Sequence, residues 1–177
     1  ESNRLSFLLE KDFTRYFKMS FVTWSISTNK EFLYPNELTI ENVNIASIGP
    51  ILEYDRRDHP FVTRSGYYAK LSSEYGDENL GSSDGVHYLR NIGQVNAYVP
   101  FRYRDIVWAN SIGGGYLTNI KDSDGSNVPD VKAFKLGGRD TIRGFEPNEI
   151  PRDTDRNGNL VRVTSESHYY LFKSELR

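Results

Sequence analysis

The sequence contains no cysteine, and this absence excludes a disulfide framework and any thiolate metal site. Methionine occurs once, and the longest apolar runs cover only a few residues, so no segment has the length of a transmembrane helix. The net charge of −2 gives no electrostatic reason to expect nucleic acid as a partner. These absences leave a β-barrel open, because a membrane-spanning strand needs only about ten alternating residues.

Aromatic residues and glycine are abundant instead. Of the 177 residues, 12 are Tyr, 10 are Phe and 14 are Gly. A soluble helical protein holds more Ala, Leu and Met, so this composition favours strands. The length is that of one domain or of part of one. We expect part of one, because strand-like sequence already surrounds Glu1 and still continues at Arg177.

Seven stretches alternate between apolar and polar residues, which is typical of β-strands. In the last one, Tyr170 and Phe172 share one face, whereas Lys173 and Glu175 share the other. Most are longer than the roughly five to six residues that are usual in soluble domains. The seven predicted strands are Asn3–Lys11, Arg15–Ser27, Val43–Tyr54, Gly66–Tyr75, Val86–Val99, Asp105–Leu117 and Ser167–Arg177.

The connections between these stretches differ greatly in length. The links Lys11–Thr14 and Pro100–Arg104 are short, the link Thr28–Asn42 is long, and the segment 118–166 is much longer still. Outer-membrane barrels combine short periplasmic turns with long external loops, although a soluble sandwich also tolerates uneven loops. A structureless loop of this length argues against a compact soluble domain, whereas a barrel has a lumen to receive it. We therefore predict an all-β, antiparallel up-and-down meander.

Two motifs and a closing strand carry more specific information. The stretch Gly49–Pro60 ends in DRRDHP and is followed by Gly66, and the motif residues of the turn are Asp55, Arg57, Asp58, Pro60 and Gly66. Its run of acidic and basic residues predicts a solvated, hydrogen-bonded turn, in which the ring of Pro60 fixes its own φ and Gly66 begins the next strand. We assign no catalytic role to Asp55 or Asp58.

The second motif is FKLGG (Phe134–Gly138) followed by IRGF (Ile142–Phe145), and the closing strand ends in FKSELR (Phe172–Arg177). In this order, these patches resemble the bacterial surface-antigen family, the BamA- and TamA-type barrels of outer-membrane assembly and translocation. The second motif is similar to the signature of that family's sixth extracellular loop. The resemblance covers nearly the whole chain, although only these patches are specific.

The resemblance implies that the seven strands are strands six to twelve of a sixteen-stranded transmembrane barrel in the bacterial outer membrane. The POTRA domains and the terminal barrel strands are then absent from this chain, and the long inserted loop, about 118–166, folds into the lumen. The implied function is a BamA-like assembly factor that helps unfolded outer-membrane proteins insert into the bilayer. Its partners are then the lipid bilayer, those clients and accessory lipoproteins, with no enzymatic activity and no cofactor.

For the loop, the resemblance implies a latch made by Gly137, Gly138, Ile142, Arg143, Gly144 and Phe145. Arg143 carries a permanent charge on a planar donor fork, so it is suited to hold a lumenal carboxylate by paired hydrogen bonds. In the family this carboxylate belongs to the strand that follows the present chain. The alternative is an exposed arginine in an ordinary glycine-rich turn.

A weaker pattern lies inside the long loop. Asp153, Asp155 and Asn157 have the spacing of the first ligands of a calcium loop, but the twelfth position holds Thr164 instead of a bidentate glutamate. The alternative interpretation of these residues is a hairpin turn at Asn157-Gly158. The three histidines are scattered without ligand spacing, which gives no zinc site.

Two further features have two interpretations each. The run Gly113–Gly115 lies inside a predicted strand, where it allows either strand curvature or close approach of the folded-in loop. Trp24, Trp108 and the many tyrosines fit either the interfacial girdles of a membrane barrel or the core of a soluble β protein.

Three alternative functions therefore stay open at this point. Within the resembling superfamily, the chain fits a two-partner secretion pore or the barrel anchor of a lipase passenger. Outside it, the chain fits a soluble all-β binding module.

Overall fold

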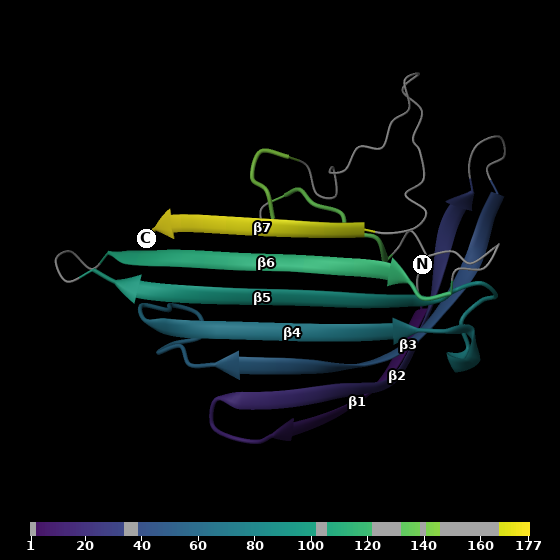
Figure 1. The fold of residues 1–177 in the computed structure, drawn as a ribbon, viewed down its shortest axis with the longest axis horizontal. Coiled ribbons are helices and arrows are strands. Elements are labelled where there is room, and N and C mark those ends of the chain that lie inside the picture. The colour runs from purple at the N-terminus through teal and green to yellow at the C-terminus, as the bar shows by residue number, and fades with distance from the viewer. Residues whose placement is uncertain (1–2, 34–38, 102–105, 122–131, 139–140, 146–166) are drawn as a thin grey trace.

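The computed structural model describes residues 3–33, 39–101, 106–121, 132–138, 141–145 and 167–177. They form one seven-stranded antiparallel sheet in which spatial order follows chain order (Figure 1), which confirms the predicted all-β meander. A short 3-10 helix, η1 (Glu78–Leu80), follows the fourth strand. The strands are β1 (Asn3–Asp12), β2 (Phe17–Leu33), β3 (Thr39–Asp55), β4 (Gly66–Gly76), β5 (Tyr88–Pro100), β6 (Val107–Asn119) and β7 (Ser167–Leu176).

The predicted strand boundaries are correct to within a few residues, except between β2 and β3. We predicted a long loop over Thr28–Asn42, but β2 continues to Leu33 and β3 already begins at Thr39. Residues of both strands continue the same antiparallel ladder there. The prediction was wrong because it required apolar alternation, whereas backbone hydrogen bonds between strands need no particular side chain.

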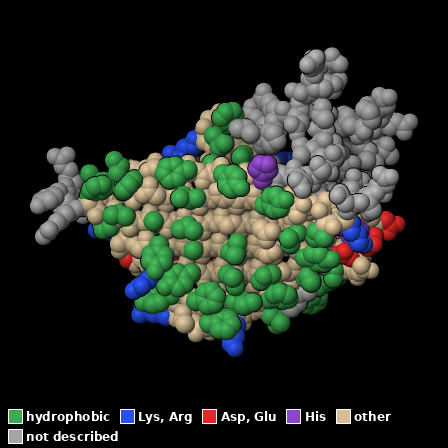
Figure 2. Space-filling model, in the orientation of Figure 1, with side chains coloured by type: hydrophobic (Ala, Val, Ile, Leu, Met, Phe, Trp, Pro, Cys, Tyr) green, Lys and Arg blue, Asp and Glu red, His purple; other side chains and the backbone are tan. Residues whose placement is uncertain are grey.

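One face of the sheet, the apolar face, presents hydrophobic side chains to the surroundings. Figure 2 shows them spread over the strands, with the charged side chains gathered near the margins. The strand register explains this, because residues two apart point to the same side and paired residues share a face. Its exposed members include Leu5, Phe7, Leu9, Tyr67, Leu71, Val95, Val99, Trp108, Ile112, Tyr116, Tyr170, Phe172 and Leu176.

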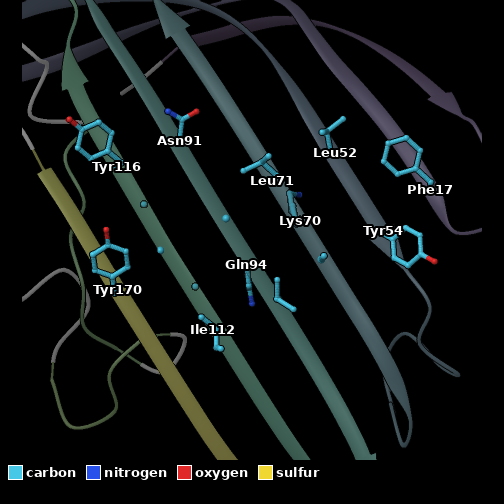
Figure 3. Close-up of a pocket in the computed structure, with 16 residues that line it drawn as sticks. Phe17, Leu52, Tyr54, Lys70, Leu71, Asn91, Gln94, Ile112, Tyr116 and Tyr170 are labelled. Carbon is cyan, nitrogen blue, oxygen red and sulfur yellow. The ribbon is translucent and has the colours of Figure 1, made fainter.

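The apolar face also has a shallow hollow. Gly93 of β5 pairs with Gly114 of β6, and neither position contributes a side chain. The hollow has a volume of about 550 Å³ and is bordered by Leu71, Ile112 and Tyr170, among others (Figure 3).

The opposite face, the polar face, carries most of the charged strand residues whose side chains the structure describes. Lys18 of β2 pairs with Glu10 of β1 at 2.7 Å, and Lys70 of β4 pairs with Glu53 of β3 at 2.6 Å. These pairs join neighbouring strands at register positions on one side of the sheet. Antiparallel sheets commonly bury one face and leave the other in water, so the two faces of this sheet require different surroundings.

The buried core is small and lies at one end of the polar face. It consists of Ile45, Val86, Tyr88, Leu117 and Phe134, of which Phe134 comes from the long segment after β6. Most of the other aromatic residues are on the apolar face. Tyr67 and Tyr75 lie near the two ends of β4, which is the arrangement of aromatic girdles in membrane barrels. Among the described residues, no helix is long and apolar enough to span a membrane.

The loop between β4 and β5 covers an edge of β3. The β3–β4 ladder stops at Gly76, and Ser83 then takes over by donating its backbone N–H to the Asn44 carbonyl at 2.8 Å. The Ser82 and Ser83 hydroxyl groups accept the backbone N–H groups of Ala46 and Asn44, each at 2.9 Å. These bonds satisfy backbone groups that would otherwise form an open sheet edge.

This loop is organised by a buried carboxylate, Asp77. Burial opposes ionisation of Asp77, but hydrogen bonds from Asn79, His87 and Tyr75 outweigh it and lower the pKa of Asp77 to about 2. The His87 Nδ1 atom lies 2.9 Å from Asp77 Oδ2, and the Tyr75 hydroxyl donates to the same oxygen at 3.0 Å. The stabilisation from ionised Asp77 is therefore complete above its unfolded pKa near 4 and is lost as pH falls towards 2.

Candidate functional site

The long segment between β6 and β7 contacts the polar face at the parts that the structure describes. We call residues 132–138 and 141–145 the docked segment. Figure 1 shows it in green beside β7. It touches the sheet at two places, one around Lys132 and Phe134 and the other around Arg143.

The first contact is centred on the Glu74 carboxylate of β4. Its Oε1 atom accepts the hydroxyl groups of Ser47 and Tyr88, each at 2.8 Å, and forms a short ion pair with Lys132. Arg90 places Nη1 3.8 Å from the other carboxylate oxygen. Ion pairs that combine several donors with partial burial are less exposed to solvent screening than isolated surface pairs.

Phe134 lies beside this ion pair and is buried. Its ring makes an edge-on contact with Tyr169 of β7 at a centroid distance of 4.8 Å, and the Arg90 guanidinium lies over it at 4.8 Å. The ring also occupies the space where a side chain of Gly115 would be, because a Cβ atom there would lie 2.5 Å from Phe134 Cζ. The close approach predicted for the glycine run is therefore confirmed at Gly115.

The glycines of the second motif shape a compact tip. Gly137, Gly138 and Gly144 all have positive φ, at 124°, 89° and 96°. The Gly138 N–H donates to the Phe145 carbonyl at 3.0 Å, which closes the tip. The Thr141 hydroxyl accepts the Gly137 N–H at 2.7 Å and lies 2.8 Å from the Gly137 carbonyl. Left-handed φ values favour glycine, so the backbone geometry explains why glycine occupies these three positions.

Arg143 lies in this tip and reaches the polar face of β7. Its Nη2 atom donates to Glu175 Oε2 at 3.2 Å, while 78% of the arginine side chain stays exposed. The resemblance implies a carboxylate on the strand that follows the present chain, so that pairing stays a prediction. Within this chain one hydrogen bond joins Arg143 to Glu175 of β7. Glu175 also accepts Arg177 Nε at 2.6 Å, so two guanidinium groups share one carboxylate.

A polar cavity of about 690 Å³ separates the tip from the polar face of the sheet. Thr141, Ile142 and Arg143 line one side, and Asn96, Ser111 and Lys173 are among the residues on the other. A space with this lining is suited to hold water or a polar chain segment. Ile142 is half-buried at its margin, while Phe145 is exposed.

The first motif forms the tight turn that the sequence predicted. Arg57 binds Asp55 with both ends of its fork, Nε to Oδ1 at 2.9 Å and Nη2 to Oδ2 at 2.6 Å. A third Arg57 nitrogen donates to the Pro60 carbonyl at 3.1 Å. Gly66 has a φ of 109°, and a Cβ atom there would overlap the Arg56 backbone.

Asp58 holds the rest of this turn together. Partial burial raises its pKa, but backbone N–H groups of Ser65, Arg64 and His59 outweigh burial and hold the pKa below its usual value. Their nitrogens lie 3.2, 3.0 and 2.9 Å from Asp58 Oδ1. Asp55, Arg57, Asp58, Pro60 and Gly66 therefore meet in one structural turn.

The calcium candidates Asp153, Asp155 and Asn157 lie outside the described residues. Within the part of the chain that the structure describes, no group of three or more His, Asp or Glu side chains is placed to hold a metal ion. The contacts that the sequence did not single out are those of Lys132, Glu74 and Thr141. Lys132 and Glu74 are 58 residues apart, and neither residue gives a local signal of this pairing. Thr141 bonds within the tip, where a lone threonine gives no signal of its partner.

Comparison with known proteins identifies the family of this chain. The model of the Omp85 superfamily domain matches residues 3–171. The outer membrane protein assembly factor BamA of Nitratidesulfovibrio vulgaris is 25% identical over 142 residues, which cover 77% of this chain and 17% of that protein. The chain thus spans about a sixth of the length of this relative. It belongs to the Omp85 superfamily, a family of protein insertion and secretion in the bacterial outer membrane.

Proposed function

We propose that this chain is part of the wall of a transmembrane β-barrel in a BamA-like factor that inserts proteins into the outer membrane. The observation that carries the proposal is the division of the sheet. One face is apolar, with exposed side chains on every strand except β3, where they are half-buried, and the other carries ion pairs and the docked segment. In a barrel, lipid covers the first face and water fills the space along the second.

The sheet has seven strands, with β1 and β7 at its edges. Open edges do not occur in the hydrocarbon region, because unpaired backbone groups there cost several kcal/mol each. We therefore assign further strands to both edges, as in a sixteen-stranded barrel that holds segment 118–166 in its lumen. POTRA domains and the terminal strands then belong to regions of the protein beyond this chain.

The proposed mechanism is physical and needs no chemical step. A barrel with a weak seam offers an unpaired edge to an incoming strand and so reduces the cost of its unsatisfied backbone groups in lipid. The contribution of this chain is a rigid wall away from the seam, together with a segment that occupies the lumen. Unfolded outer-membrane proteins are the proposed clients, with accessory lipoproteins as further partners.

In this scheme the latch motif positions the tip of the segment. The Arg143–Glu175 contact supports the assignment, as do the positive φ angles of the three motif glycines. Replacement of Arg143 by Ala in the full-length protein is expected to reduce assembly activity. Normal growth on complementation is the outcome that argues against a positioning role.

Reconstitution of the full-length protein into liposomes tests the function itself. We expect faster insertion of an urea-unfolded outer-membrane protein than in protein-free liposomes, measured by its acquired protease resistance. No acceleration, combined with export of a soluble passenger through the same liposomes, favours the two-partner secretion pore instead. A lipase domain in the flanking sequence favours the anchor of a lipase passenger.

A further inference from the structure

The hollow of the apolar face continues towards a basic rim at the short-turn end of the sheet. Its lining includes the paired residues Phe17 and Tyr54, which lie next to the turns β1–β2 and β3–β4 (Figure 3). We propose that hollow and rim together bind one anionic phospholipid of the periplasmic leaflet, with an acyl chain in the hollow and the phosphate at Arg15 and Arg56. The inference rests on the proposed function in placing the apolar face in lipid.

Gly93, at the centre of the hollow, has no reason inside the chain to be glycine. Its φ is not positive, and a Cβ atom there would meet only Leu71 Cδ1, at an ordinary 3.8 Å. Its partner Gly114 is different, because a Cβ atom there would lie 3.1 Å from the Tyr169 carbonyl oxygen and 3.2 Å from a Tyr170 ring carbon. Glycine weakens a strand interior and often marks a place where another molecule approaches closely. The space above Gly93 is therefore available to a molecule from outside the chain.

Two arginines form the basic rim beside the hollow. The guanidinium groups of Arg15 and Arg56 lie over the ring of Tyr16, at 5.6 and 5.5 Å from its centre. Among the described residues, no carboxylate forms an ion pair with either arginine, and Asp55 is bound by Arg57. Figure 2 shows basic side chains at this end of the apolar face (lower left), where the short turns mark the periplasmic side. Two exposed guanidinium groups without an acidic partner are complementary to a phosphate.

Two stacked tyrosines connect the rim to the hollow. Tyr54 lines the hollow and stacks on Tyr67, with the ring centres 5.6 Å apart and the planes inclined by 14°. Hydrogen bonding to Tyr67 raises the pKa of Arg56, which places the guanidinium beside this pair. A tyrosine ring contacts apolar chains while its hydroxyl group stays at the polar boundary. The rim, the tyrosine pair and the hollow thus follow one another in the order of headgroup, interface and acyl chain.

The direction from the rim to the hollow also fits a lipid. Arg56 lies opposite Tyr67, which pairs with Ala97, and Gly93 is four residues further along β5. Gly93 is thus about 13 Å along the strands and about 10 Å across two strands from Arg56. This direction makes an angle of about 36° with the strands, whereas barrel strands tilt by about 35–45° from the membrane normal. With the right-handed sense that strand twist sets, the line from rim to hollow follows the normal, as an acyl chain does.

Photocrosslinking in the full-length protein tests this site and needs no client protein. The probe is phosphatidylglycerol with a diazirine on one acyl chain, in nanodiscs of phosphatidylcholine, and mass spectrometry maps the crosslinked residues. We expect several-fold more crosslinks at Leu71 and Ile112 in the hollow than at Leu5 and Phe7, which lie on the same face outside it. Unlabelled phosphatidylglycerol should compete for the hollow about fivefold better than phosphatidylcholine, the effect of about one arginine near an anionic lipid.

Variants separate the two halves of the site. Arg15→Gln combined with Arg56→Gln should remove the preference for phosphatidylglycerol, whereas the matched control Lys18→Gln, near the same end but on the polar face, should keep it. Gly93→Val should reduce the crosslinks in the hollow by filling its centre, whereas Gly113→Val, on the opposite face, should not. If Gly93→Val does not fold, the arginine variants, at exposed positions, still decide the outcome.

Two results overturn the inference. One is even labelling of the apolar face without a preference for phosphatidylglycerol, which means ordinary contact with bulk lipid. The other is a hollow that the probe does not reach although Leu5 and Phe7 are labelled, which means that another protein or a second copy covers it. Absence of labelling at both sets overturns the lipid contact of the apolar face as well, so failure of the proposed function is distinguishable from failure of the site.

Discussion

The two contacts between the docked segment and the polar face differ strongly in burial. Around Phe134 an aromatic ring, an ion pair and a glycine-lined space coincide in a buried patch. Around Arg143 one hydrogen bond joins two side chains in solvent, and a second arginine already satisfies the carboxylate. We therefore expect the buried contact, and not the more prominent sequence motif, to contribute most to holding the segment.

The largest effect is expected from the aromatic ring. Phe134→Ala should lower the free energy of unfolding of the full-length protein by about 3 kcal/mol, because large-to-small changes at buried aromatics cost about 3–5 kcal/mol. Phe145→Ala is the matched control, since Phe145 is 47% exposed and should cost little. Denaturant unfolding in bilayers measures both. Equal losses would remove the distinction between the two contacts.

Filling the space under the ring should have the next largest effect. Gly115→Ala is expected to cost about 1–3 kcal/mol, the usual range for overpacking. Gly113→Ala should be nearly neutral, because its Cβ meets no atom closer than 3.6 Å. A double-mutant cycle with Phe134→Ala sharpens the assignment, since the two changes should be strongly non-additive. Additive losses would mean that Gly115 serves the strand and not the segment.

The ion pair should contribute less than the ring. Lys132→Met is expected to cost about 1–2 kcal/mol, below the value for fully buried pairs because both side chains keep some solvent contact. Lys135→Met serves as the control at an exposed position three residues away. Unfolding of both variants at low and high salt gives the comparison. A larger loss for Lys135→Met would place the ionic contact elsewhere.

The smallest effect on stability is expected at the motif arginine. Arg143→Ala should cost less than about 1 kcal/mol, which is typical of exposed ion pairs. Glu175→Gln should add little to it, since the pair is removed by either change. The measurement is the same unfolding transition, with growth by complementation recorded beside it. A loss similar to that of Phe134→Ala would reverse the ranking of the two contacts.

Much of the fold was predictable because strand alternation is a local signal. The pairs of β4 to β7 follow from residues that alternate between apolar and charged, such as Phe172 and Lys173. The extension of β2 and β3 was missed because polar residues continue that ladder without alternation. Local patterns thus predict which residues face which side, but not how far a hairpin continues.

The site was predictable only in part, for a related reason. The turn at Asp55 and the tip glycines depend on neighbours in sequence, and their geometry follows from short-range rules. Lys132 and Glu74 are 58 residues apart, and their contact depends on how the segment returns to the sheet. The glycine run gave the one hint, because a strand without side chains has room for an approaching chain.

The central claim is that the polar face borders water while the apolar face contacts lipid. Phe172 and Lys173 are neighbours on β7 and point to opposite faces. Single spin labels at these two positions, in the full-length protein in bilayers, should differ in accessibility. The label at 172 should collide mainly with oxygen dissolved in lipid, and the label at 173 with a water-soluble nickel chelate. Equal access of the nickel chelate to both labels would contradict the account.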